Sequence, residues 1–384
     1  MYLDFTDAEQ ELRAQVRSFL DERLPAGWVG IWHSREGAEL SWDVTRELAE
    51  KGWLTPQWPT AYGGRESSMW EHLVLQEEFF ARHEPRGGQY MGVNWIGPVI
   101  IRYGTDEQKA TLLPEIAQGR VQWAQLFSEP DAGSDLASLR TTAVLDGDNF
   151  IVNGEKVWTS YANMAQRGFL LARSDPSAER HRGLSALLID MHAPGVEVRE
   201  IPSTIGWHRF HSVAMTDVRV PKTALLGPLN GGWEVAMAAL PFERLGNARY
   251  ARSTRVLNLI AGAFDPAVNA SEADQFAETL ALGRVAELLN YSAAGVKERS
   301  GVLGWEASAA FASNALYERE VAQLAKDVLG FEALVATGDD HAPAQGEVES
   351  FVALQAPTVT IQAGSYQVQL SIIGQSGLGL PRAR

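Results

Sequence analysis

The chain has 384 residues, a formal net charge of −15, 45% hydrophobic residues and no cysteine. This acidic balance argues against a nucleic-acid partner, and the lack of thiols excludes disulfides, zinc ribbons and cysteine catalysis. No apolar run reaches the roughly 18 residues that span a bilayer, and the first residues lack a signal-peptide pattern, so we expect a cytoplasmic globular protein.

Residues 1–120 are predicted to form a helical domain. Thr6 with Glu9, and later Thr105 with Gln108, form capping-box patterns, and apolar residues follow each of them at helical spacing. Gly119 is placed to end the second of these helices.

From about residue 121 to residue 225 the pattern changes to short β-rich runs separated by Asp-Gly, Asn-Gly and Pro-Gly turns. The runs are 144–145, 150–152, 169–172, 184–189 and 213–220. They predict a central β domain, either a small barrel or a sandwich. His208 and His211 could form a metal pair, but no third ligand clusters with them, so a surface loop is the favoured interpretation.

Helical spacing returns from residue 226 to the end. Long helical runs are expected at about 250–262, 272–299 and 304–330. Residues 336–349 are rich in Asp, Gly and Pro and predict an exposed loop or a subunit contact. The segments 1–120, 121–225 and 226–384 are therefore expected to be three domains of an α+β protein.

The most informative stretch lies at the start of the β segment. An apolar run from Trp123 to Phe127 predicts a buried strand, and the loop Ser128–Asp135 follows it with Pro, Gly and Ser. A Ser/Gly loop offers N–H and O–H donors to an anion such as pyrophosphate, although most such loops are ordinary turns. Asn153-Gly154 between two β-rich runs predicts a hairpin turn, and Trp158 near a strand end offers a flat face to an aromatic ring.

Glu243, in the segment 226–384, is a candidate functional carboxylate. Trp233, Ala236, Met237 and Leu240 form an apolar stripe, and the helical step continues to Glu243. An inward carboxylate is costly to desolvate, and burial raises its pKa toward the range of a general base. The residues alone favour the plainer alternative, in which Glu243 pairs with an Arg of another helix.

Further motifs accompany these segments at characteristic spacing. They are Val152-Asn-Gly-Glu-Lys-Val-Trp-Thr-Ser, Tyr103-Gly-Thr-Asp-Glu-Gln-Lys, Asp217-Val-Arg-Val-Pro and the terminal Gly379-Leu-Pro. With the Ser128–Asp135 loop they resemble the acyl-CoA dehydrogenase family over nearly the whole chain. The resemblance implies a helical N-terminal domain, a central β-barrel or sandwich, a C-terminal four-helix bundle, bound FAD and a role in lipid metabolism by β-oxidation chemistry.

The resemblance also implies a catalytic base. In this family a glutamate removes the α-proton of an acyl-CoA thioester while the β-hydride passes to flavin N5. The base lies either in a C-terminal Tyr-Glu-Gly-Thr-like motif or on the helix after a Gly-Trp turn, just before an Arg. Here Ala363 stands at the first position and cannot take a proton, whereas Glu243 and Arg244 match the second. This is the arrangement of isovaleryl-CoA-dehydrogenase-like and steroid side-chain-degrading members, with Glu243 as base and Arg244 in the substrate site.

Several positions match the flavin contacts of the family. They are Leu126, Phe127, Ser128, Gly133, Ser134, Trp158, Thr159 and Ser160, with a looser match at Ser365 and Gln367. Ser134 also matches the family's contact with the CoA end of the substrate.

One family feature is missing. Members usually carry an Arg-Lys-x-Phe-Gly segment that reaches the neighbouring subunit's FAD pyrophosphate, and residues 262–284 do not match it. Leu329-Gly330 loosely preserves the family's other cross-subunit segment. Steroid-type members pair two unlike chains, one with the base and one with the Arg segment. We therefore expect an oligomer, and our hypothesis is an α2β2 heterotetramer with an unlike acyl-CoA dehydrogenase subunit. In a homomer, Arg252, Arg255 or Arg284 would have to replace the missing Arg.

The sequence leaves three candidate functions to compare. The first is an acyl-CoA dehydrogenase that forms a trans-2-enoyl-CoA, with electron-transferring flavoprotein as acceptor. The second is a flavin monooxygenase or oxidase on the same fold, and the third is a non-catalytic partner subunit, suggested by Ala363. Glu243 argues against both alternatives. A base on the central helix weakly favours a branched, cyclic or steroid-derived acyl group. No P-loop, Rossmann or Gly-x-Ser-x-Gly pattern is present.

Overall fold

The computed structural model describes residues 4–31, 34–204, 209–245, 248–265, 270–336 and 338–381, and within these ranges it leaves out the side chains of residues 243–245. Contacts divide the chain into two compact units, each continuous in space but not in sequence. One, here called the helical unit, comprises Met1–Gly37, Ser67–Pro85 and Arg244–Arg384. The other, the sheet unit, comprises Ala38–Glu66 and Arg86–Glu243. The division into three domains remains a prediction from the sequence.

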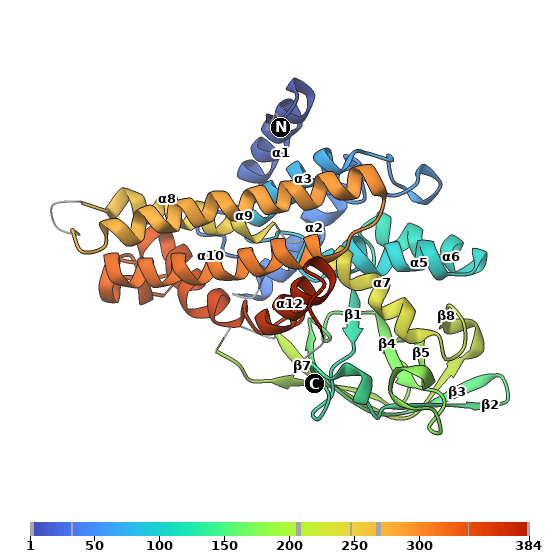
Figure 1. The fold of residues 1–384 in the computed structure, drawn as a ribbon. Helices are drawn as coiled ribbons and strands as arrows, with labels where there is room; N and C mark the ends of the chain where they lie inside the picture. The colour runs from blue at the N-terminus through green and yellow to red at the C-terminus, as the bar shows by residue number, and fades with distance from the viewer. Residues whose placement is uncertain are drawn as a thin grey trace. The chain divides into compact units, whose positions relative to one another are not determined.

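The helical unit is built on long helices that pack side by side (Figure 1). Its helices are α1 (Asp7–Arg23), α3 (Met69–Ala81), α8 (Arg249–Ala263), α9 (Ala273–Ser300), α10 (Trp305–Leu329), α11 (Glu347–Glu349) and α12 (Tyr366–Ile372). The capping box expected at Thr6 is present, because its side chain accepts from the Glu9 N–H and Glu9 accepts from the Thr6 N–H. The core under α8, α9 and α10 is apolar, with Val256, Ile260 and Val321 fully buried.

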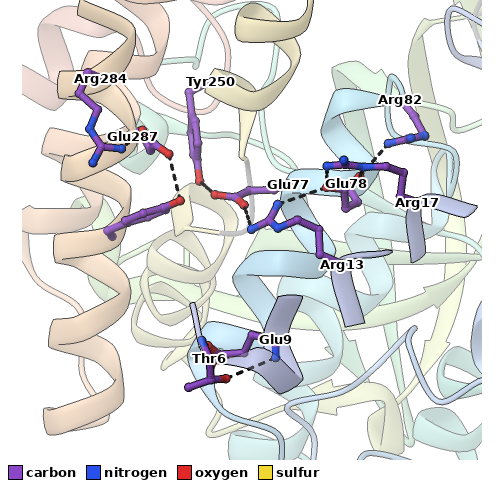
Figure 2. A network of polar contacts seen from close by, with 11 residues as sticks. Thr6, Glu9, Arg13, Arg17, Glu77, Glu78, Arg82, Tyr250, Arg284 and Glu287 are labelled. Carbon is purple, nitrogen blue, oxygen red and sulfur yellow. Dashed lines mark hydrogen bonds and ion pairs between the residues drawn. The ribbon is translucent and has the colours of Figure 1, made fainter. Parts of the chain in front are cut away.

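A polar network ties α1, α3 and α8 together (Figure 2). The guanidinium of Arg13 donates to Glu77 Oε2 at 2.5 Å and to Glu78 Oε1 at 3.2 Å. The hydroxyl of Tyr250 donates to the other oxygen of Glu77, and Arg82 pairs with Glu78 at 2.8 Å. Each buried carboxylate therefore has charged or hydroxyl donors, which is the condition for burying such a group without a large penalty.

The sheet unit is organised around one eight-stranded sheet (Figure 1). Its strands are β1 (Trp123–Leu126), β2 (Thr142–Asp146), β3 (Asn149–Ser160), β4 (Arg167–Arg173), β5 (Leu184–Asp190), β6 (Val196–Ile201), β7 (Phe210–Pro221) and β8 (Leu225–Leu226). The order is β6-β7-β3-β2-β4-β5-β8, and β1 pairs with β4 in parallel. The expected strands are confirmed, and β6 and β8 were not among them.

Helices complete the sheet unit. They are α2 (Arg35–Glu50, which begins in the helical unit), α4 (Gln89–Met91), α5 (Gly97–Tyr103), α6 (Asp106–Ala117) and α7 (Gly232–Leu245). The second capping box is confirmed at Thr105 and Gln108, and Gly119 has a φ of +63° just beyond α6, as a C-terminal glycine should. The amide of Gln108 also donates to Thr223 O and Leu225 O, so this cap ties α6 to the β segment.

The prediction of a hairpin turn at Asn153-Gly154 was wrong. β3 runs straight through both residues, and the chain turns earlier, at Gly147-Asp148, where Asp146 pairs with Asn149. The Asn153 side chain is used across the sheet instead. Its amide donates to Asp217 Oδ1 at 3.0 Å, and its oxygen accepts from the Asp217 N–H at 2.8 Å. Gly154 has a φ of +151° at a register shift, so the glycine serves a bulge and not a turn.

Two smaller expectations also change. The segment expected to be an exposed loop at 336–349 becomes buried at its end, where Glu347 and Val348 are 5% and 1% exposed. His211 lies within β7 and is buried, so it does not belong to a surface loop, while His208 is outside the described residues. Among the helices that the structure describes, none combines the length and apolarity needed to cross a membrane.

Candidate active site

The site begins where β1 ends. Leu126 is fully buried, and the ring of Phe127 packs edge-on against Phe169 at 5.2 Å between centroids. The chain then leaves the core as the Ser128–Asp135 loop, which turns tightly because the N–H of Glu129 donates to Ala132 O at 2.8 Å. Beyond this turn Gly133 and Ser134 are exposed, and a Cβ added at Gly133 would meet no atom within 4 Å. The loop therefore presents a small residue and an exposed serine at the surface.

A bulge in β3 brings a second element to this loop. Lys156 pairs with Val213 of β7, and the next pair is Thr159 with His211, so β3 has one extra residue between the two pairs. The N–H of Val157 turns away from β7 and donates to Ser128 O at 2.9 Å. Trp158 follows with a φ of +58°; it is 58% exposed, and its ring stands nearly perpendicular to that of Phe210 at 5.8 Å between centroids. A large aromatic face is thus held at the surface directly after a hydrogen bond to the loop.

A buried ion pair that the sequence reasoning did not single out lies beneath both elements. Lys156 is fully buried, and its Nζ donates to Glu129 Oε1 at 2.8 Å and to Phe127 O at 3.0 Å. Burial lowers the pKa of Lys156 to about 8, against the attraction of Glu129. Burial is the largest influence on Glu129 and acts to raise its pKa, but the Lys156 charge together with the hydrogen bonds from Lys156, Thr141 and the Arg140 N–H lowers the pKa overall. Alternation along β3 offered a signal, because Lys156 shares the inward register of Phe150 and Val152.

The end of β3 carries further polar groups. Thr159 is 1% exposed, and its Oγ1 has no hydrogen-bond partner among the residues that the structure describes. Ser160 beside it is half-buried. A buried hydroxyl without a partner is costly, so this position is suited to a polar ligand atom.

The two C-terminal positions lie in the helical unit and are described separately. Ser365 caps α12, its hydroxyl accepting from the Val368 N–H at 3.4 Å, and Gln367 is exposed. Ala363 before them has a φ of +56°, and its carbonyl accepts from the amide of Gln369 at 3.1 Å. The segment has a fixed turn but carries no acid at position 363.

The proposed base and its neighbour lie on the last turn of α7, whose helical backbone is confirmed. Among the described side chains of this helix the buried positions are Gly232, Val235, Ala236 and Ala239, about one residue from the predicted stripe. A helical step of four from Ala239 still reaches position 243. The side chains of Glu243 and Arg244 are outside the described part of the structure.

Comparison with known proteins identifies the chain. Residues 6–120 match the family described as "Acyl-CoA dehydrogenase, N-terminal domain", and residues 124–218 match "Acyl-CoA dehydrogenase, middle domain". The acyl-CoA dehydrogenase IpdE1 of Mycobacterium tuberculosis is 34% identical over 97% of this chain and 98% of its own length. The chain belongs to the acyl-CoA dehydrogenase family. The expected fold and enzyme class are thereby confirmed.

Other acyl-CoA dehydrogenases resemble the chain over its full length. The acyl-CoA dehydrogenase FadE26 of Mycobacterium tuberculosis is 31% identical and covers 100% of both proteins. The solved structure "Tcur3481-Tcur3483 steroid ACAD" has a TM-score of 0.90 at 31% identity, covering 100% of both chains. The ChsE4-ChsE5 complex from Mycobacterium tuberculosis has a TM-score of 0.87 at 30% identity, again with full coverage.

Acyl-CoA dehydrogenases are FAD-dependent enzymes, and the sheet-unit residues fit this cofactor. The exposed Trp158 supplies an aromatic face, the Ser128–Asp135 loop supplies small and hydroxyl residues, and the Thr159 hydroxyl has no partner in the described part of the chain. These features lie in one unit and are joined by the hydrogen bond between Val157 and Ser128.

The three arginines considered as substitutes for the missing cross-subunit segment all have partners within this chain. Arg252 is buried and pairs with Glu318 at 2.6 Å. Arg255 pairs with Glu347 at 2.5 Å, and Arg284 pairs with Glu287 one helical turn away (Figure 2). Each of these arginines therefore already uses part of its charge and some of its N–H donors on a carboxylate of this chain.

Proposed function

We propose that this acyl-CoA dehydrogenase oxidises the Cα–Cβ bond of an acyl-CoA thioester and forms a trans-2-enoyl-CoA. FAD is the proposed cofactor, and Glu243 is the proposed base. The observation that carries the proposal is the exposed Trp158 on its bulge, tied through Val157 to the Ser128–Asp135 loop. An indole that is 58% exposed at a fixed backbone position loses apolar contact with water when a planar ring covers it. A surface position with no ligand would gain nothing from this arrangement.

The residues of the sheet unit have separate tasks in the proposed cofactor site. FAD, when bound, supplies the acceptor for the β-hydride of the substrate. Leu126 and Phe127 form the apolar base of the loop, and Ser128, Gly133 and Ser134 offer small or hydroxyl groups above it. Trp158, Thr159 and Ser160 are the proposed contacts from β3, next to the hydrogen bond between Val157 and Ser128. Ser365 and Gln367 of the helical unit are proposed as further contacts on family grounds.

Glu243 is the proposed acceptor of the α-proton. The other position used in the family is Ala363, whose side chain has no ionisable group. In the balanced reaction the Glu243 carboxylate would take the α-proton, and the Cα–Cβ bond would become double as the β-hydride leaves the substrate for the acceptor that FAD would supply. A carboxylate needs a desolvated setting for this task, because burial raises its pKa toward that of the weak carbon acid. Arg244 is proposed to lie in the substrate site.

A branched, cyclic or steroid-derived acyl group is the proposed substrate class. The support is twofold: the base position that the chain retains, and similarity at 31% identity to a solved enzyme that is itself titled a steroid ACAD. Electron-transferring flavoprotein is the proposed electron acceptor.

The proposed reaction is tested by anaerobic mixing of the purified flavoprotein with a panel of saturated acyl-CoA thioesters, monitored by loss of flavin absorbance. Bleaching by a saturated thioester is expected. The Glu243→Gln variant should bleach at least about a thousand-fold more slowly, since it removes the proton acceptor. Glu234→Gln is the matched control, because Glu234 is exposed on the same helix. Full rate in Glu243→Gln would show that another group is the base.

We also propose that the active form pairs this chain with an unlike acyl-CoA dehydrogenase subunit. The support is the missing Arg-Lys-x-Phe-Gly segment together with the internal partners of Arg252, Arg255 and Arg284. Expression of this chain alone should give a form with little FAD. A stable homo-oligomer that is fully loaded with FAD and active would contradict the pairing. A chain that never bleaches, even with its partner, would instead favour the non-catalytic subunit suggested by Ala363.

A further inference from the structure

The buried ammonium of Lys156 is directed entirely at the loop of the candidate site. It is 0% exposed, and within the described part of the structure it donates to Phe127 O at 3.0 Å and to Glu129 Oε1 at 2.8 Å. Burying an ammonium group in this way is costly, and a strand interior is more simply filled by an apolar residue. The placement therefore requires a reason beyond packing.

Glu129 extends the same contact to the other end of the loop. Its carboxylate accepts from the Arg140 N–H at 2.6 Å and from the Thr141 N–H at 2.8 Å, just before β2 begins. The Lys156–Glu129 ion pair thus connects three places: Phe127 just before the loop, Glu129 in its turn, and residues 140–141 after it. These are charge-assisted hydrogen bonds to backbone groups, which are stronger and shorter than neutral ones.

The neighbouring residues of β3 complete the connection. Val157 donates to Ser128 O at 2.9 Å, and Trp158 follows on the same bulge. Consecutive residues 127, 128 and 129 are therefore held by consecutive residues 156 and 157. Movement of the loop and movement of the Trp158 backbone are coupled through these contacts.

We propose that Lys156, with Glu129, is a positioning residue: it holds the Ser128–Asp135 loop and the bulged Trp158 in their binding arrangement before FAD arrives. The naming of FAD rests on the proposed function, but the order of the loop is a property of the free chain. Preorganisation of this kind strengthens binding because the ordering cost has already been met during folding.

The alternative is that the pair only stabilises the fold. Replacing a buried ion pair by neutral side chains often restores or improves stability, whereas removing one partner leaves an unpaired buried charge. The double variant Lys156→Met/Glu129→Gln therefore separates the two roles. It contains no buried charge at this place, and it also lacks the donor to Phe127 O.

Hydrogen–deuterium exchange of the full chain, followed by peptide, measures the order of the loop without any cofactor. The variants are Lys156→Met, Glu129→Gln and the double variant. Arg252→Met serves as a matched control, since it breaks another buried ion pair, the one with Glu318 in the helical unit. Thermal unfolding of each variant is recorded alongside.

In Lys156→Met we expect amides of residues 128–141 and 157–160 to exchange roughly ten- to a hundred-fold faster, with peptides of α9 and α10 unchanged. The double variant should recover the melting temperature but keep the fast exchange of the loop. Arg252→Met should lower the melting temperature without accelerating the loop. Normal loop exchange in Lys156→Met, or recovery of both properties in the double variant, would overturn the positioning role.

Titration with FAD, in whichever assembly carries the flavin, gives a second and separate result. Lys156→Met and the double variant should bind FAD roughly ten-fold or more weakly than the wild type. If the loop exchanges fast in the variants but no assembly of the wild type binds FAD, positioning holds and the proposed function fails. If FAD binds equally tightly to all variants, the function stands and the positioning role is refuted.

Discussion

We expect the helical unit to lose stability at acid pH because the Glu347 carboxylate becomes protonated there. Its carboxylate is 6% exposed, accepts from Arg255 at 2.5 and 2.9 Å, and lies 3.0 Å from His83 Nε2. The amide of Gln355 lies 3.2 Å from His83 Nδ1, so a neutral His83 can accept there and donate to Glu347. Burial by itself raises the pKa of Glu347, but the hydrogen bonds from His83 and Arg255 outweigh it and lower the pKa to about 2.

The size of the effect follows from this value. A fall from the ordinary 4.5 to about 2, at about 1.4 kcal/mol for each pKa unit, corresponds to roughly 3 kcal/mol of folding free energy. Because the folded pKa is the lower one, this contribution is complete above the unfolded value of 4.5. It is lost as the pH falls from about 4.5 through about 2. The half-exposed Arg255 makes the figure an upper value.

The perturbation is Glu347→Gln, which keeps the shape and an acceptor but removes the charge. Urea unfolding followed by far-UV circular dichroism should show the variant less stable than the wild type by about 2 to 3 kcal/mol near neutral pH. By about pH 3.5 this difference should have fallen by roughly 1 kcal/mol. Glu278→Gln, at an exposed position of α9, is the control and should differ little at any pH. A difference for Glu347→Gln that stays constant with pH would refute the reasoning.

Two further outcomes test the sheet unit. Gly154→Ala should lower stability by about 2 kcal/mol or more in thermal unfolding, because φ is +151° and the new Cβ would lie 2.5 Å from Thr141 Oγ1. Gly147→Ala is its control, since φ is +58° there but the space around it is open, and an equal loss in both would point to the positive φ alone and not to the contact with Thr141. Trp158→Ala should weaken FAD binding roughly ten-fold in a fluorescence titration with little change in melting temperature, because the indole is 58% exposed. Unchanged affinity would remove Trp158 from the cofactor site.

Features determined by neighbouring residues could be predicted from the sequence. Both capping boxes form between side chains three residues apart, so Thr6 and Thr105 begin helices as expected. The long helices and most strands follow from periodic burial, which is also local. The family motifs, and through them the fold, were recognisable for the same reason: they are short runs with fixed spacing.

Other features depended on partners that lie far away in the chain, and only the tertiary structure could decide them. Asn153-Gly154 has the composition of a hairpin turn, but Asp217 of β7 takes the Asn153 side chain and the strand continues. Lys156 is a charged residue that finds its partner at Glu129, and the 336–349 segment is buried at Glu347 because His83 and Arg255 meet it. The sequence contains each of these residues, but the energy of a hydrogen bond or ion pair exists only once folding has brought both partners together.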